Sequence, residues 1–305
     1  KIKSFKKKIL VPGDKSLSIR FVLFSAIASG TSKAYNLLIS DDVISAINAI
    51  KKLGVKVILN KRYCKIFGKG IDGFKYKKNI IIDARNSGTL ARLILGLLVN
   101  TPYPIKIIGD KSLSRRDFKR IARPLSKFGA KFILNRNGSL PLKIFGSKNL
   151  LPIKYFEKKG SAQCKSSVIF AGMKTKGKTL IKAKKSRNHT ELLAKYLKLP
   201  INIKNKKNFD LIKINKVKKI NPLNYNIPAD ISSASFFIVL TALIKNSELI
   251  VENVNINPSR IGVITILKKM GVVIKFKKKK IYKGEKIANI YIKSPKILKP
   301  INCPT

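Results

Sequence analysis

The segment AINAIKKLGVKVIL, residues Ala46–Leu59, combines the two periodicities that decide the fold class of this 305-residue chain. Its first half has apolar residues at the three- and four-residue spacing of an amphipathic helix. Its second half has the apolar residues Val55, Val57 and Leu59 at alternate positions, as a half-buried strand does. Gly54 stands between the halves, where a helix commonly ends. The segment therefore predicts a helix that is followed at once by a strand.

The same pattern occurs three more times along the chain. The copies are IARPLSKFGAKFIL (Ile121–Leu134), ELLAKYLKLPINIK (Glu191–Lys204) and ITILKKMGVVIKFK (Ile264–Lys277), with the punctuating residues Gly54, Gly129, Pro200 and Gly271. A further helix that opens with Ser or Gly is expected before each copy, at Ser16–Ser29, Gly88–Asn100, Ser166–Lys174 and Ser232–Ile244. Four units of helix, strand, helix and strand, each of about 70 residues, predict an α/β fold with helices packed on sheets.

A turn-rich stretch divides these units unequally. The sequence NPLNYNIP, Asn221–Pro228, follows the third unit and predicts a boundary there, and one unit comes after it. The chain also begins at Lys1 without a methionine. From the sequence we therefore expect a fragment of a longer protein with two domains.

The charge of the chain points first to nucleic acid. There are 66 Lys+Arg against 14 Asp+Glu, a formal charge of +52, and phosphate neutralisation drives nucleic-acid binding. Only 11 of the basic residues are arginine, however, and lysine is spread along the whole chain beside many Ile and Asn, as a low-GC codon bias produces. Zinc-finger spacing, ribonucleoprotein aromatic motifs and basic regions with heptads are all missing from the sequence. We therefore expect no specific nucleic-acid partner. A basic nucleic-acid-binding protein is kept as the less favoured alternative.

Hydropathy and cysteine usage limit the class of protein further. The longest apolar stretch, around Ala234–Ile244, is well short of the ~20 residues that span a bilayer, and the basic N-terminus lacks the apolar core of a secretory signal. Cys64, Cys164 and Cys303 are far apart and lack metal-ligand spacing. The sequence thus predicts a cytoplasmic protein with free thiols, without a membrane segment, disulfide framework or metal site.

Arginine carries more information than lysine in such a chain, because only its planar fork makes bidentate contacts with phosphate or carboxylate. Four arginines (Arg115, Arg116, Arg120 and Arg123) lie close together, and others (Arg20, Arg85, Arg92, Arg187 and Arg260) lie in or beside Gly- and Ser-rich segments. In VPGDKSLSIR, Val11–Arg20, a lysine and a serine open a helix and Arg20 lies one turn further on. Helix N-termini attract anions, so the pattern predicts a pocket for small anions. Each opening taken alone is better explained by a capped helix and solvated charges, and only their recurrence in successive units favours the anion pocket.

In their order along the chain, these segments resemble the 5-enolpyruvylshikimate-3-phosphate (EPSP) synthase family. The resemblance rests on Pro12–Arg20, Leu37–Val43 (LLISDDV), Asn86–Arg92 (NSGTLAR), Gly109–Arg123 (GDKSLSRRDFKRIAR), Ser161–Lys165 (SAQCK), Ser186–Glu191 (SRNHTE), Pro228–Ala234 (PADISSA) and Asn257–Arg260 (NPSR). The UDP-N-acetylglucosamine enolpyruvyl transferases share the fold but look dissimilar at Gly13–Arg20 and Ser186–Glu191, and they stay as the second alternative.

The resemblance implies an architecture and a reaction. The family fold has two domains of βαβαββ-type units, three per domain, so residues 1–12 would supply a strand of the second domain, 13–227 the whole first domain and 228–305 the start of an incomplete second domain. The reaction transfers the enolpyruvyl group of phosphoenolpyruvate to the 5-hydroxyl of 3-phosphoshikimate in aromatic amino acid (chorismate) biosynthesis. The resemblance further implies no metal or organic cofactor and a monomeric enzyme.

Site residues follow by motif. Lys15 would contact both substrates and assist proton transfer, while Ser16 and Arg20 hold the shikimate carboxylate. The remaining 3-phosphoshikimate-binding residues would be Ser161, Ala162, Gln163, Ser186 and Arg187, and phosphoenolpyruvate would contact Gly88, Arg116 and Gln163. Arg92, Asp42, Asp230 and Arg260 match motif positions with structural roles, and His189 falls beside the phosphate loop with no assigned role. The family's catalytic carboxylates have no counterpart before residue 305, so the chain by itself is expected to be inactive.

Overall fold

The computed structural model describes residues 3–302, which form two compact units. Unit 1 contains the N-terminal segment up to Asp14, residues 36–38 and the chain from Asn226 onward. Unit 2 contains Lys15–Tyr35 and Ile39–Tyr225. Cys303, one of the three predicted free thiols, lies outside the described residues.

Unit 2 is built from three successive copies of one order of elements. The first copy contains α1 (Lys15–Ala26), β2 (Ser29–Tyr35), α2 (Asp41–Lys52), β3 (Lys56–Leu59) and β4 (Tyr63–Lys69). The second contains β5 (Ile81–Asp83), α3 (Gly88–Leu97), β6 (Ile105–Ile108), the 3₁₀ turn η1 (Leu113–Arg115), α4 (Lys119–Ser126), β7 (Lys131–Leu134) and β8 (Leu142–Phe145). The third contains β9 (Lys154–Glu157), α5 (Ala162–Lys174), β10 (Lys178–Lys184), α6 (His189–Tyr196), β11 (Ile201–Asn205) and β12 (Phe209–Asn215).

Each copy forms one four-stranded sheet. The strand orders are β13-β2-β4-β3, β5-β6-β8-β7 and β11-β12-β10-β9, where β13 (Asn224–Asn226) joins the first sheet from the end of the third copy. In the second and third sheets the first strand of the copy pairs in parallel with the next one, β5 with β6 and β9 with β10, and the other pairs are antiparallel. The first sheet therefore joins the two ends of unit 2.

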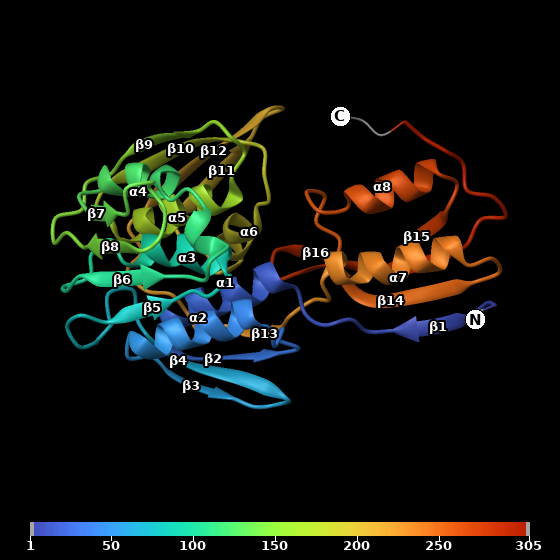
Figure 1. The fold of residues 1–305 in the computed structure, drawn as a ribbon, viewed down its shortest axis with the longest axis horizontal. Coiled ribbons are helices and arrows are strands. Elements are labelled where there is room, and N and C mark those ends of the chain that lie inside the picture. The colour runs from blue at the N-terminus through green and yellow to red at the C-terminus, as the bar shows by residue number, and fades with distance from the viewer. Residues whose placement is uncertain (1–2, 303–305) are drawn as a thin grey trace. The chain divides into compact units, whose positions relative to one another are not determined.

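The helices of unit 2 lie between these sheets (Figure 1). Helices α1, α3 and α5 are buried on all sides over most of their length, which the apolar runs FVLF, LILGL and VIFAGM in their second halves favour. Gly96 allows α3 and α5 to approach closely, since a Cβ atom there would lie 2.1 Å from the carbonyl oxygen of Ser167. Helices α3 and α5 thus pack directly against each other in the centre of unit 2.

Unit 1 repeats the same order once more. It contains β1 (Lys6–Ile9), α7 (Ile231–Leu243), β14 (Glu248–Asn255), α8 (Gly262–Lys269), β15 (Val273–Tyr282) and β16 (Glu285–Lys293). Its sheet has the order β1-β14-β16-β15, and β1 runs parallel to β14 with Lys6 opposite Glu248. Residues such as Ile238, Val251 and Ile290 form its core.

The α/β fold class and its βαβαββ units are confirmed, and the predicted start of one helix is corrected. Helix α5 begins at Ala162, one turn before the predicted Ser166, because Ser161 caps it by accepting a hydrogen bond from the backbone N–H of Cys164. In the third copy the residue with positive φ after the helix is Lys198, with φ 54°, two positions before the punctuating Pro200. Asn221–Pro228 contains strand β13 as well as turns. A second antiparallel strand follows each of the four repeated helix–strand segments, as the βαβαββ unit implies.

Among residues 3–302, the helices are too short or too polar to cross a membrane.

A buried lysine at the end of α5 forms part of the core of unit 2. The ammonium group of Lys174 donates a hydrogen bond of 2.8 Å to Asn100 Oδ1 and lies 3.5 Å from Asp72 Oδ1, with the ring of Phe74 beneath it. Burial lowers the pKa of Lys174 from 10.5 to about 8, and the attraction of Asp72 offsets part of this effect. Charged Lys174 therefore costs folding free energy at neutral pH.

We expect the K174M variant to remove a pH-dependent part of the stability. The unfolded chain binds a proton at this site up to pH 10.5 and the folded chain only up to about pH 8, so this group makes the protein more stable as the pH rises between those values. Denaturant unfolding at several pH values measures the free energy of unfolding of both proteins. The value for K174M minus the value for the wild type should decrease by about 3 kcal/mol between pH 8 and pH 10.5, because a tenfold change in proton affinity corresponds to ~1.36 kcal/mol. Parallel pH profiles of the two proteins would contradict the assignment.

Candidate active site

Arg20 joins the starts of three helices in unit 2. Its Nε–H donates to Thr190 Oγ1 at 2.7 Å and one Nη2–H donates to Ser166 Oγ at 3.2 Å, while Nη1 donates to the carbonyl oxygen of Ser16 at 3.0 Å. The Ser166 and Thr190 hydroxyl groups lie 2.7 Å apart. Three of the segments singled out in the sequence, at the starts of α1, α5 and α6, therefore meet around one buried guanidinium.

Gln163 is held between α3 and α5. Its Oε1 accepts a hydrogen bond of 2.7 Å from Arg92 Nη1, and its Nε2 donates to Thr89 Oγ1 at 3.1 Å. The Arg92 guanidinium lies over the ring of Phe118. Both ends of the Gln163 amide are thus fixed, so its orientation is set before any ligand binds.

Gly88 begins α3 beside a group of arginines. A Cβ atom at Gly88 would lie 3.0 Å from Arg92 Nη1 and 3.1 Å from Arg116 Nη1. Burial and the nearby charges of Arg120 and Arg116 lower the pKa of Arg92. The glycine leaves room for a ligand to approach these guanidinium groups, and their mutual repulsion favours an anion there.

The segment that carries Arg116 is fixed by turns before it and after it. Asp110 accepts hydrogen bonds from the backbone N–H of Leu113 and from Asn86 Nδ2, which lower the pKa of this exposed carboxyl and tie the segment to the loop before α3. Asp117, directly after Arg116, accepts from the backbone N–H of Lys119 at the start of α4. The carboxylate of Asp117 is therefore engaged with a helix start.

The other predicted residues lie at the openings of three helices. Lys15 is half-exposed at the first residue of α1 and pairs with Asp42 Oδ2 at 3.3 Å, and Ser16 follows it. Ser161 caps α5 and Ala162 begins it, and the backbone N–H of Ser161 donates to the buried Glu157 at 2.7 Å. Ser186 and the exposed Arg187 come directly before α6, and His189 begins that helix in a fully buried position.

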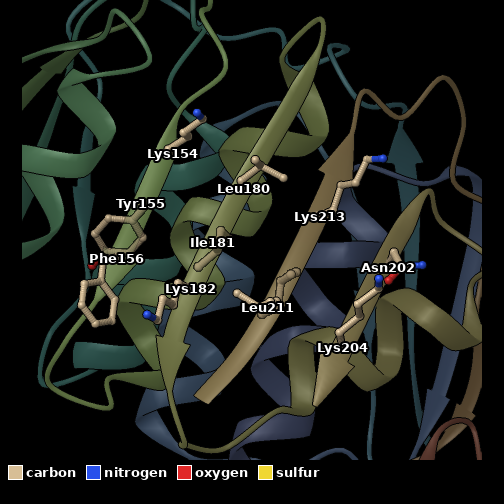
Figure 2. A pocket seen from close by; sticks show the side chains of 11 residues that line it. Lys154, Tyr155, Phe156, Leu180, Ile181, Lys182, Asn202, Lys204, Leu211 and Lys213 are labelled. Carbon is tan, nitrogen blue, oxygen red and sulfur yellow. The ribbon is translucent and has the colours of Figure 1, made fainter. Parts of the chain in front are cut away.

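A hollow on unit 2 lies away from the openings of these helices. It has a volume of about 610 Å³ on the outer face of the sheet β11-β12-β10-β9, where Leu180 and Leu211 lie among Lys154, Lys182, Lys204 and Lys213 (Figure 2). None of the predicted site residues lines it. Alternating lysine and apolar residues also mark the outward positions of β3 and β7, so this face follows the general composition of the chain.

In the described part of the chain, no three His, Cys, Asp or Glu side chains are grouped so that they could hold a metal ion.

Comparison with known proteins assigns the chain to a family. The family model described as EPSP synthase (3-phosphoshikimate 1-carboxyvinyltransferase) matches residues 1–303. The chain belongs to the EPSP synthase family. The resemblance that the sequence motifs carry is thereby confirmed, and with it the prediction of a transferase.

Individual relatives agree with this assignment. A 3-phosphoshikimate 1-carboxyvinyltransferase of Sulfurihydrogenibium sp. is 39% identical over 96% of this chain and 68% of its own length. The enzyme of that name from Streptococcus agalactiae is 41% identical over 89% of this chain and 63% of its own length. The solved structure of EPSP synthase from Acinetobacter baumannii superposes on all of this chain and 68% of its own, with a TM-score of 0.90 and 36% identity. The chain thus spans about two thirds of the length of the relatives it matches.

Several side chains of this site were not predicted from the sequence. Thr89 and Thr190 are not among the predicted site residues and Ser166 is predicted only as a helix start, although each contacts a predicted residue. Lys165 and Glu191 were noted only as the ends of motifs. The one available signal for Lys165 is a lysine at the end of the motif that carries Ser161 and Gln163, directly before the predicted helix Ser166–Lys174.

Proposed function

We propose that unit 2 binds the substrates of enolpyruvyl transfer at the openings of α1, α3, α5 and α6. In this reaction the enolpyruvyl group of phosphoenolpyruvate moves to the 5-hydroxyl of 3-phosphoshikimate, which gives EPSP and inorganic phosphate. The observation that carries the proposal is the Arg20 network, because it brings three of the motif segments to one place. The complete transfer also needs carboxylates that the family resemblance does not locate in this chain.

The proposed 3-phosphoshikimate residues divide between two ends of the ligand. Ser16 and Arg20 would hold the carboxylate, and Ser161, Ala162, Gln163, Ser186 and Arg187 would surround the ring and the 3-phosphate. The Ser186 hydroxyl is buried and has no hydrogen-bond partner among the described residues, which supports its use for a ligand oxygen. Hydrogen bonds to an anion at such a site are charge-assisted and correspondingly strong.

Phosphoenolpyruvate would lie against Gly88, Arg116 and Gln163, with Lys15 in contact with both substrates. Support for this comes from the approach of Arg92 and Arg116 to Gly88 and from the fixed amide of Gln163. Fixed cationic donors lower the energy of a transition state in which negative charge builds up on the departing phosphate. Lys15, held by Asp42, would assist the proton transfer.

The same proposal covers the finer predictions about the protein. Residues 13–227 would form the domain that receives 3-phosphoshikimate, and residues 1–12 and 228–305 would belong to the second domain. The protein would be a cytoplasmic monomer that uses no metal or organic cofactor and has no specific nucleic-acid partner. Support for a reducing compartment comes from the buried free thiols of Cys64 and Cys164, of which Cys64 has its pKa raised to about 12 by burial.

Calorimetric titration tests the proposal. We expect the chain to bind shikimate 3-phosphate selectively over shikimate at about 0.15 M salt, where surface attraction is screened. The K15A variant should bind shikimate 3-phosphate more weakly, and alanine at the exposed Lys61 should have no effect. Equal affinity for both ligands would contradict the proposal. Binding of single-stranded DNA with a steep salt dependence and no preference for the phosphorylated ligand would favour a nucleic-acid-binding protein instead.

A further inference from the structure

Two buried charged side chains of unit 2 are not among the proposed substrate-binding residues. Lys165 lies on α5 and Glu191 on α6, and their side chains are 0% and 3% exposed. Lys165 Nζ is 2.7 Å from Glu191 Oε1, which is close enough for an ion pair although the two groups are not aligned as a hydrogen bond. The other carboxylate oxygen, Oε2, has no hydrogen-bond partner among the described residues.

The lysine-rich composition does not account for this pair. Codon bias adds lysines where water can solvate them, whereas lysine and glutamate are almost never fully buried unless they are paired. Glu191 is also one of only 14 acidic residues in the chain. A buried ion pair contributes little net stability, since the loss of hydration of both charges offsets their attraction. The pair therefore calls for a role other than stability.

The position of the pair indicates that role. The backbone N–H of Lys165 donates to the carbonyl oxygen of Ser161, so Lys165 lies one helical turn after the residue that caps α5. Glu191 is the third residue of α6, five positions after Ser186. The neighbouring contact of Ser166 with Thr190 joins the same two turns. The ion pair thus connects the helix starts that carry the proposed phosphate-binding serines.

We propose that Lys165 and Glu191 are positioning residues for the 3-phosphate of 3-phosphoshikimate. Their ion pair fixes the spacing between the starts of α5 and α6, so that the hydroxyls of Ser161 and Ser186 reach the same phosphate group. The inference rests on the proposed function of unit 2 and adds to it two residues that do not themselves touch the ligand. An anion held by several fixed donors is sensitive to small changes in their separation.

The test replaces the pair while keeping the size of the side chains. The K165M/E191M variant exchanges both charges for apolar groups of similar volume, which commonly preserves or raises stability. The variant, the wild type and K174M are each titrated with shikimate 3-phosphate and with shikimate, and each is unfolded with denaturant. K174M is the matched control, because it removes another buried lysine of the same helix at its far end. The ratio of the two dissociation constants isolates the contribution of the phosphate.

We expect K165M/E191M to fold with at least the stability of the wild type and to bind shikimate 3-phosphate about tenfold more weakly or worse, as small misplacements of binding groups do. Its affinity for shikimate, and both affinities of K174M, should not change. A folded double variant with the wild-type ratio overturns the inference. If the double variant does not fold, K165Q/E191Q decides in the same way, since it removes both charges and keeps polar side chains of similar size that can bond to each other. A wild-type chain that does not distinguish the two ligands overturns the proposed function as well.

Discussion

Lysine in place of Arg20 should reduce the affinity of the chain for shikimate 3-phosphate by about a hundredfold, although the positive charge is kept. Arg20 is buried and donates to Thr190, Ser166 and the carbonyl oxygen of Ser16 from three different nitrogen atoms. A lysine ammonium is a single point of charge on a flexible stem and cannot reproduce this fork. The R20K variant would therefore lose the geometry of the site and not its charge.

The expected size of the effect follows from the hydrogen bonds involved. A hundredfold loss of affinity corresponds to about 2.8 kcal/mol, which is the contribution of one strong or two weak hydrogen bonds between a charged group and the ligand, at about 1.5–3 kcal/mol each. The Ser166 and Thr190 hydroxyls can still bond to each other, so the cost to folding should be smaller than the cost to binding.

Calorimetric titration of R20K with shikimate 3-phosphate measures this effect, and circular dichroism establishes that the variant is folded. Arg136 lies on the exposed surface of the same unit, so R136K is the matched control and should bind as the wild type does. Wild-type affinity in R20K would show that Arg20 contributes charge alone or no contact at all. Wild-type affinity in R20K would therefore contradict the role that the proposed function gives to the hydrogen bonds of Arg20.

Local sequence predicts the fold well at positions where the backbone conformation requires one residue type, such as glycine at positive φ. Gly54, Gly129 and Gly271 each have positive φ after a helix, as the repeated pattern indicates. In the third copy Lys198 adopts that conformation without glycine, because the packing of α6 and β11 sets the turn there. The three-residue strands β5 and β13 are too short to give a periodic signal, and only their pairing with β6 and β2 defines them.

The start of α5 shows a second limit of local sequence. Ser161 and Ser166 are both suitable capping residues, and the polar residues between them hide the helical pattern because the helix is buried on all sides from Cys164 onward. Tertiary packing, which the local pattern does not report, selects Ser161. This difference matters for function, because it places Gln163 and Lys165 inside the helix.

For the candidate site, motifs located the residues but not their partners. Arg20 was identified from one ten-residue segment, whereas its contacts Ser166 and Thr190 lie 146 and 170 positions away. The same holds for Gln163 and Arg92, which are 71 positions apart. Such pairs form only when the three copies pack around one set of central helices. The sequence therefore predicts which residue types bind the ligand, but it does not predict which side chains hold them in place.

The R260M variant should destabilise unit 1 by about 3–5 kcal/mol, the usual cost of leaving buried charges without their partner. Arg260 is 5% exposed and donates from Nη1 to Asp14 Oδ2 at 2.9 Å and from Nη2 to Asp230 Oδ1 at 2.9 Å. It also donates to Ser232 Oγ at 2.7 Å at the start of α7. Asp14 is fully buried, so its carboxylate would lose a partner that water cannot replace.

The effect should be confined to unit 1, because all of these residues belong to it. Hydrogen exchange during denaturant titration separates the two units: in R260M the amides of β14 and β16 should exchange at a lower denaturant concentration, and those of α1 and α5 should keep their protection. K293M is the matched control, since Lys293 forms an exposed ion pair with Glu248 at 3.4 Å in the same sheet, and such pairs contribute about 0–1 kcal/mol. If R260M and K293M have equal effects, Arg260 is not a structural residue of unit 1, and its guanidinium would have to be considered for a direct role in ligand binding.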